Sequence, residues 1–150
     1  MKKITILLTI LPVLFLGLVS CKKTPTDTME KWIKSIKNFN DKMIVVYDEE
    51  VVKEALAAHI EELQEVVNEI GEWNFDQLSQ KEKEALAREL SPYIRKIKDK
   101  WFLTRYFASR TNALRFGFRN SAIKYDYEVF VLLADTIKNA VLYVEKRGKR

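Results

Sequence analysis

The sequence is poor in the residues that cross-link or punctuate a chain. Its 150 residues include one cysteine, Cys21, and one histidine, His59, with only four glycines and three prolines. A single cysteine excludes an internal disulfide, and Cys21 with His59 supplies too few ligands for a typical zinc site. Few turn residues, together with abundant Ala, Leu, Glu, Lys and Arg, disfavour a many-stranded sandwich or barrel. The composition therefore predicts long helices held together by packing alone.

The first 21 residues differ from the rest of the chain. Met1-Lys2-Lys3 is positively charged, residues 4–19 are apolar, and small residues follow before a cysteine. This order indicates a secretory signal peptide. Leu18-Val19-Ser20-Cys21 resembles the lipobox of bacterial lipoproteins. The resemblance implies that residues 1–20 are removed, that Cys21 carries covalent lipid such as palmitate, and that the protein is membrane-anchored in the cell envelope, outside the cytoplasm.

Two other interpretations of this segment stay open. An ordinary signal peptide is cut elsewhere, or residues 4–19 remain as a transmembrane helix. A span needs about 20 apolar residues, and Pro12 interrupts this run, so a cleaved signal is favoured. In families with the lipobox, Asp directly after the cysteine often retains the protein in the inner membrane. Lys22 at that position favours the outer membrane if the organism has one.

Charge is divided unequally along the mature chain. Residues 22–90 contain 10 Lys and Arg against 16 Asp and Glu, whereas residues 91–150 contain 14 against 5. The balances of −6 and +9 leave only +3 overall, which gives little support to nucleic-acid binding. Helices of opposite charge packed side by side explain the division; the alternative is a basic surface that meets anionic lipid or an acidic partner.

Apolar residues recur at helical spacing after a short tether of residues 21–28. Asp27 is predicted to cap the first helix, which has a weak point at residues 38–41. A junction near residues 47–49 precedes a second helix, which ends at Gly71 with a positive φ. The apolar stripes of these two helices are Met29, Trp32, Ile33, Ile36, Met43, Ile44 and Tyr47, then Val52, Leu56, His59, Leu63, Val66, Val67 and Ile70.

The second half of the chain contains further helix signals. Ser79 and Glu82 have the spacing of a capping box. Ser91-Pro92 fits the start of a new helix, with a kink inside one continuous helix as the alternative. Apolar residues then shift to the opposite side of the helical wheel, so this helix is either covered on two sides or bends near residues 101–104. A last, most buried helix follows Asn120 or Ser121. We predict an all-α fold, with residues 29–150 forming a single domain that is an antiparallel bundle of four or five helices.

Few residues suggest catalysis. His59 lies within an apolar stripe, which favours a core or boundary histidine over an acid–base group. Glu61 and Glu62 are adjacent carboxylates on the polar side of their helix, where they are expected to be solvated. No metal site, phosphate loop or cofactor motif is present, and the only expected non-protein group is the lipid on Cys21. The prediction is a protein that is not an enzyme.

Arg110 is an unusual charge, because helical spacing puts it beside Tyr106, Phe107 and Leu114, which are expected in the core. Asp126 lies beside an apolar stripe of the next helix. A buried charge needs a partner, since an unpaired one costs several kcal/mol. Arg110 and Asp126 are therefore predicted to form a buried ion pair. The alternative is that Arg110 extends its guanidinium to water.

One stretch mixes basic and aromatic residues, and it is the candidate interaction patch. Such mixtures supply many of the dominant contacts in protein interfaces; ordinary core aromatics with solvated arginines are the alternative. The predicted function is non-enzymatic binding or scaffolding of another envelope component, with no nucleic-acid partner. A carrier or sensor of an apolar ligand and an envelope enzyme are the second and third possibilities. The patch consists of Trp101, Arg105, Arg115, Phe116, Phe118 and Arg119.

Overall fold

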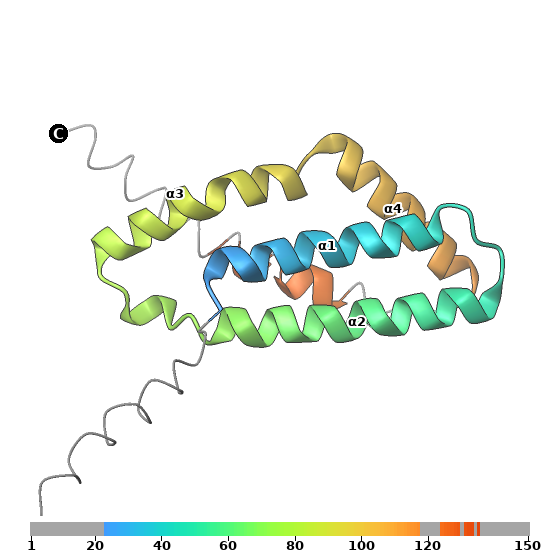
Figure 1. Cartoon of the computed structure of the whole chain (residues 1–150), viewed down its shortest axis with the longest axis horizontal. Helices are drawn as coiled ribbons and strands as arrows, with labels where there is room; N and C mark the ends of the chain where they lie inside the picture. The colour runs from blue at the N-terminus through green and yellow to red at the C-terminus, as the bar shows by residue number, and fades with distance from the viewer. Residues whose placement is uncertain (1–22, 118–123, 130, 134, 136–150) are drawn as a thin grey trace, which may run out of the picture.

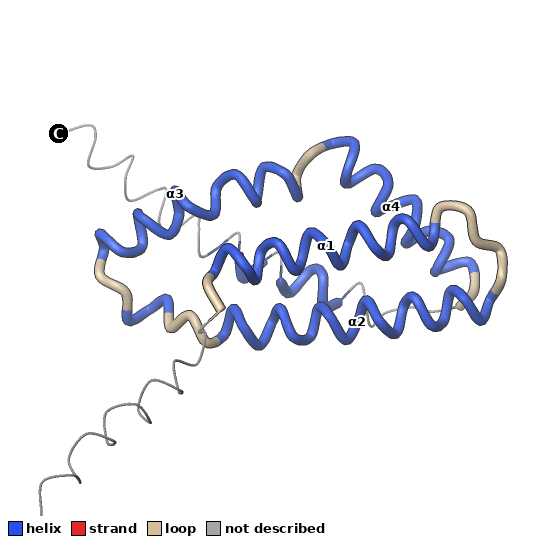
Figure 2. The backbone as a smooth tube through the Cα atoms, viewed as in Figure 1, coloured by secondary structure: helices blue, strands red, loops and turns tan. Residues whose placement is uncertain are grey.

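The computed structural model describes residues 23–117, 124–129, 131–133 and 135 (Figure 1). All regular structure in these residues is helical (Figure 2), which confirms the all-α prediction. Residues 124–129, 131–133 and 135 are also helical and are called the C-terminal segment. The predictions for Cys21, Phe118, Arg119, Asn120 and Ser121 lie outside the described residues. The named elements are α1 (Pro25–Met43), α2 (Glu49–Gly71), the short 3-10 helix η1 (Phe75–Gln77), α3 (Gln80–Ile97) and α4 (Lys100–Arg115).

Helix α1 lies at the centre of the described bundle. It contacts α2, α3 and α4; α2 runs antiparallel beside it, and α3 lies on its other side (Figure 1). Val129 and Leu133 of the C-terminal segment are buried in the same core. None of the described helices is long and apolar enough to cross a bilayer.

Helix α1 begins earlier than predicted. Thr24 is the N-cap and Pro25 occupies the first turn, so the predicted cap at Asp27 is wrong. Asp27 is instead the third residue of a capping box: the Thr24 hydroxyl accepts from the Asp27 amide, and the Asp27 carboxylate accepts from the Thr24 amide. Residues 25–28, predicted as tether, therefore belong to the helix, because this local hydrogen-bond exchange nucleates the first turn.

The apolar stripes of α1 and α2 form most of the core. Helix α1 continues through the predicted weak point at residues 38–41, because Phe39 and Asn40 are buried against its neighbours. Three predicted stripe members are not buried: Ile44 and Val67 are half-buried, and Tyr47 is exposed. The stripe residues that the core buries are Met29, Trp32, Ile33, Ile36 and Met43 of α1, and Val52, Leu56, His59, Leu63, Val66 and Ile70 of α2.

The ends of α2 match the sequence in part. Asp48 caps its N-terminus by accepting from the amides of Glu50 and Val51. Gly71 is its last residue but does not have a positive φ; that conformation belongs to Asn74, at φ 45°. Asn tolerates the left-handed region better than most residues, so the turn into η1 is made three residues later than predicted.

Helix α3 is continuous, so the preferred prediction of a new helix at Ser91-Pro92 is wrong. Ser79 and Glu82 form the predicted capping box, and Pro92 lies inside the helix. The break comes at Asp99, whose carboxylate accepts from the amides of Trp101 and Phe102 and so starts α4. Asp99 therefore places the bend just before the predicted residues 101–104.

Substitutions at residues 91 and 92 separate a continuous α3 from a split one. Pro92→Ala is expected to raise the free energy of unfolding by about 1–3 kcal/mol, because it restores a backbone donor and removes a ring clash. Ser91→Ala is expected to change it by less than about 0.5 kcal/mol, since Ser91 is exposed within the helix. Urea unfolding measures both. Loss of an N-cap lowers the free energy of unfolding by about 1 kcal/mol. A decrease of that size in Ser91→Ala would contradict a continuous α3.

A charged cluster joins the first turns of α1 to the end of α2. Lys31 binds Glu65 and Glu69, Lys23 binds Glu69 at 2.6 Å, and the Thr28 hydroxyl donates to Glu69 at 2.8 Å. Burial by itself raises the pKa of Glu69, but hydrogen bonds from Lys23, Thr28 and Lys31 outweigh it and leave that pKa below its ordinary value. The ion pair between Lys23 and Glu69 therefore holds the chain against the bundle two residues before α1 begins.

Glu69→Gln tests this cluster through its pH dependence. A carboxyl whose folded-state pKa is lowered stabilises the fold above its unfolded pKa, and that contribution is lost as pH falls through the folded value. The variant is expected to be about 1–2 kcal/mol less stable than the natural protein at about pH 7. The difference should shrink as pH falls below the ordinary pKa of a glutamate carboxyl. Urea unfolding across this range measures it, with the exposed Glu61→Gln as control. A pH-independent difference would contradict the account.

Candidate functional site

The predicted partners Arg110 and Asp126 lie together. Arg110 Nη1 of α4 is 3.7 Å from Asp126 Oδ2 of the C-terminal segment, so the predicted ion pair is present. The distance exceeds that of a hydrogen bond. The Arg110 guanidinium also lies over the rings of Tyr106 and Phe107, at 5.3 and 6.0 Å from their centroids. Arg110 is half-buried and Asp126 is buried.

His59 lies on the other side of Asp126 and connects it to α1. His59 Nδ1 is 2.8 Å from Ser35 Oγ, and His59 Nε2 is 3.3 Å from the Tyr106 hydroxyl and 3.8 Å from Asp126 Oδ1. The imidazole also stacks on Phe39, with centroids 4.6 Å apart. The interpretation of His59 as a buried, satisfied histidine agrees with this geometry. We call Ser35, His59, Tyr106, Arg110 and Asp126 the buried polar cluster.

The charges of this cluster are affected by burial. Burial raises the pKa of Asp126, and interaction with His59 opposes that rise only in part. Burial also lowers the pKa of Arg110. Both carboxylate oxygens of Asp126 lack a hydrogen-bond partner among the described residues. The cluster therefore contains a carboxyl group that is held beside a cation without direct hydrogen bonds.

Ser35, His59 and Asp126 are the residue types of a hydrolytic triad, but their arrangement does not expose a nucleophile. Ser35 is 1% exposed, and neither Ser35 nor His59 lines the neighbouring groove. The 3.8 Å separation of Asp126 from His59 is too long for the hydrogen bond that orients a catalytic histidine. As it stands, the cluster connects four helical elements in the core.

An apolar groove of about 340 Å³ lies beside the cluster. Arg110 and Asp126 form part of its wall, and Phe107 and Tyr127 are exposed at 56% and 68%. This volume is at the lower end of those that hold small molecules. The remaining lining comes from α1, the end of α3 and the first half of α4, namely Trp32, Ile36, Ile97, Lys98, Leu103 and Tyr106.

The described members of the predicted interaction patch do not form one surface. Trp101 is 64% exposed, and the Arg105 guanidinium lies 4.4 Å from its ring centroid. Arg115 is exposed at the other end of α4, about 21 Å along the helix from Trp101. Phe116 packs against the core. Only Trp101 and Arg105 therefore form a basic–aromatic pair within the described part of the patch.

The core face of α4 differs from the predicted one. Phe107 and Leu114, expected in the core, are 56% and 37% exposed. The buried positions are instead Phe102, Tyr106, Ser109 and Ala113. Ser109 and Ala113 are small residues one turn apart. Such spacing permits close approach to another helix. Tyr106, which was expected in the core, is buried on this face.

Asn112 is a structural residue that the sequence analysis missed. Its side-chain amide donates to the Met43 carbonyl at 2.8 Å, and Ser109 Oγ lies 3.5 Å from the Asn40 carbonyl. These contacts hold α4 against the C-terminal end of α1.

No family model, curated protein or solved structure matches the chain. Among the described residues, no three Cys, His, Asp or Glu side chains gather as metal ligands.

Arg110→Gln tests the charge balance of the buried polar cluster. Removing the cation leaves Asp126 without its ion-pair partner, and a loss of about 1–3 kcal/mol in unfolding free energy is expected near neutral pH. An acid with a raised folded-state pKa favours the fold at low pH and loses that contribution as pH rises. The loss should therefore be smaller at about pH 4 than at about pH 8. Urea unfolding measures it.

Arg105→Gln is the matched control, because Arg105 is exposed on the same helix. It is expected to change the free energy of unfolding by less than about 0.5 kcal/mol at either pH. Equal effects of the two substitutions would contradict a special role for Arg110.

Proposed function

We propose that this protein is a lipid-anchored envelope protein whose helical domain binds another envelope component without catalysing a reaction. Leu18-Val19-Ser20-Cys21 supports the anchor. Lys23, two residues after Cys21, is already paired with Glu69 on α2. A lipid on Cys21 would therefore hold the domain within about 7–10 Å of the bilayer surface.

The observation that carries the binding proposal is the exposure of two large aromatic side chains of α4. Trp101 and Phe107 are both more than half exposed, and Arg105 stacks on Trp101. Trp, Tyr and Arg contribute most of the binding energy in many protein interfaces. A large aromatic side chain left in water also loses the free energy of burial, about 1.5–3 kcal/mol. A protein partner that covers α4 would recover it.

The apolar groove favours a second candidate, a carrier of an apolar small ligand. Its wall is almost entirely apolar side chain apart from Arg110, Asp126 and Lys98. A ligand of this kind would lie between α1 and α4, with its polar end at Arg110. The partner and the carrier proposals are distinguished by whether a protein or a small molecule protects Phe107.

A photo-crosslinking amino acid at Trp101 tests the leading proposal in intact cells. We expect one dominant crosslinked protein of the envelope, and we expect Phe107→Ser to reduce its yield about tenfold, since about 1.4 kcal/mol of binding corresponds to that factor. The control position is Arg88, which is exposed on α3. The proposed interface would be contradicted if residues 101 and 88 gave the same crosslinked proteins in the same yield. It would also be contradicted if residue 101 crosslinked only to other copies of this protein.

The anchor has its own test. Mass spectrometry of the protein purified from membranes should find residues 1–20 absent and an acylated Cys21, and Cys21→Ser should release the protein into the soluble fraction. An unmodified sulfur in a soluble protein would contradict the anchor but leave the crosslinking result standing.

A further inference from the structure

A second groove, of about 430 Å³, lies between α1 and α3 and contains three lysines. Lys34 and Lys37 come from the outer side of α1, and Lys96 from the last turn of α3; all three are exposed. We call these three residues the lysine surface. The other lining residues are Glu30, Ile33, Pro92 and Tyr93.

The charges of the lysine surface are not neutralised within the described chain. None of the three lysines forms an ion pair with a described carboxylate. Glu30, one helical turn before Lys34, also lines the groove, and its carboxylate accepts from the Tyr93 hydroxyl at 3.3 Å. Asp41, one turn after Lys37, is exposed on the same side of α1 but does not line the groove. Burial, followed by the charge of Glu30, raises the pKa of Tyr93, so the phenol remains a donor. The lining of the groove therefore carries three lysines and one carboxylate.

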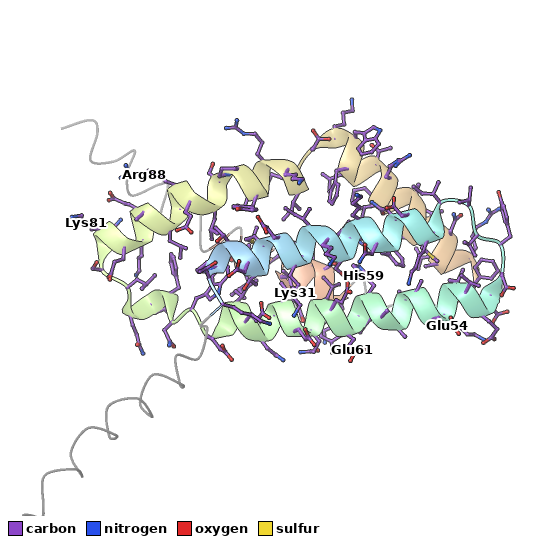
Figure 3. The ribbon with its side chains drawn as sticks, viewed as in Figure 1. Lys31, Glu54, His59, Glu61, Lys81 and Arg88 are labelled. Carbon is purple, nitrogen blue, oxygen red and sulfur yellow. The ribbon has the colours of Figure 1, made fainter. Side chains whose placement is uncertain are left out.

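The contrast with Lys31 supports this interpretation. Lys31 lies on the same helix but faces α2, where it pairs with Glu65 and Glu69 (Figure 3). Helix α2 supplies carboxylates to the lysines that face it, whereas α3 brings Lys96 to the lysines on the opposite side. Exposed lysines on neighbouring helices repel one another weakly in water, and an anion that lay between them would relieve that repulsion.

We propose that the lysine surface docks on the anionic headgroups of the membrane that carries the lipid anchor. The proposal rests on the anchor of the proposed function to bring the surface to the bilayer. Lys34 and Lys37 lie about 14 and 18 Å along α1 from Pro25. The domain then lies with the outer side of α1 against the bilayer, rather than standing on its N-terminal end.

The form of the groove favours a headgroup layer over a small free anion. Lysine is a flexible point charge, and no backbone amides or arginine fork in this groove fix the orientation of a phosphate. A layer of anionic headgroups needs no such orientation. Each lysine near it contributes about 1 kcal/mol, and the attraction extends about one Debye length.

Site-specific fluorescence on the anchored protein tests the proposal. Asn38→Cys puts a thiol on the exposed side of α1 beside Lys34 and Lys37, and the natural Cys21 is blocked by lipid. The full lipoprotein, labelled there with a nitrobenzoxadiazole dye, is reconstituted in liposomes that contain a headgroup spin-labelled lipid as quencher. We expect stronger quenching in phosphatidylcholine–phosphatidylglycerol liposomes than in phosphatidylcholine alone. About 1 M NaCl should abolish the difference, because the Debye length falls to about 3 Å.

Two controls make the result specific. A dye at Glu61→Cys, on the edge of α2 away from α1 (Figure 3), should show no dependence on phosphatidylglycerol. Lys34→Gln with Lys37→Gln should lower the docking equilibrium about thirty-fold. Lys81→Gln with Arg88→Gln removes the same charge from the far end of α3 (Figure 3) and should leave docking unchanged.

The proposal that the lysine surface docks on anionic headgroups would be overturned if the dye at residue 38 were quenched equally in the two kinds of liposome. Equal effects of the two double substitutions on quenching would overturn it as well. A position-38 crosslink to an acidic protein in cells, without dependence on phosphatidylglycerol, would overturn it in favour of a protein partner. If the protein does not incorporate through its lipid, the anchor fails instead. Cosedimentation of the same variants with phosphatidylglycerol vesicles then tests, without the anchor, whether the lysine surface binds anionic headgroups.

Discussion

The apolar stripe of α1 is the contact on which the described fold depends. Helices α2, α3 and α4 each pack against α1, and Met29 and Met43, near its two ends, are completely buried. Burial of each large apolar side chain contributes about 1.5–3 kcal/mol. The single cysteine provides no internal disulfide to add to this stability. Because three helices cover α1, its exposed residues lie on one outer side, where Lys34 and Lys37 lie between Glu30 and Asp41.

The buried polar cluster restricts how the helices pack on this stripe. His59 contacts Ser35 of α1, Tyr106 of α4 and Asp126 of the C-terminal segment. A shift of any one helix by a turn would leave a buried donor or acceptor unpaired, at a cost of about 1–3 kcal/mol. Asp126 also belongs to the wall of the apolar groove. A molecule in that groove would therefore act on the charge balance of the core through Arg110 and Asp126.

The described surface is divided by charge and polarity in a way that suits a membrane-anchored binding domain. The base, where Lys23, Lys31 and Glu69 join α1 to α2, lies beside the proposed anchor. The lysine surface lies farther along α1, and the aromatic side chains of α4 lie beyond the α3–α4 corner. The opposite charges of the two halves of the sequence do not explain the ion pairs of the fold. Acids of α2 pair with lysines of α1 although both helices belong to the acidic half, and Lys96 of the basic half lies beside Lys34 and Lys37 in a groove.

The sequence by itself determined the elements that depend on local interactions. The stripes of α1 and α2, the caps at Asp48 and Ser79, and the anomalous charge of Arg110 can all be read within a few turns of helix. Tertiary structure alone decided the continuity of α3 at Pro92, the exposure of Phe107 and the grouping of the three lysines. Helix α4 has apolar residues on two sides, so its buried face depends on which side fits α1. Ser109 and Ala113 allow that close approach, and only the packed neighbour reveals it.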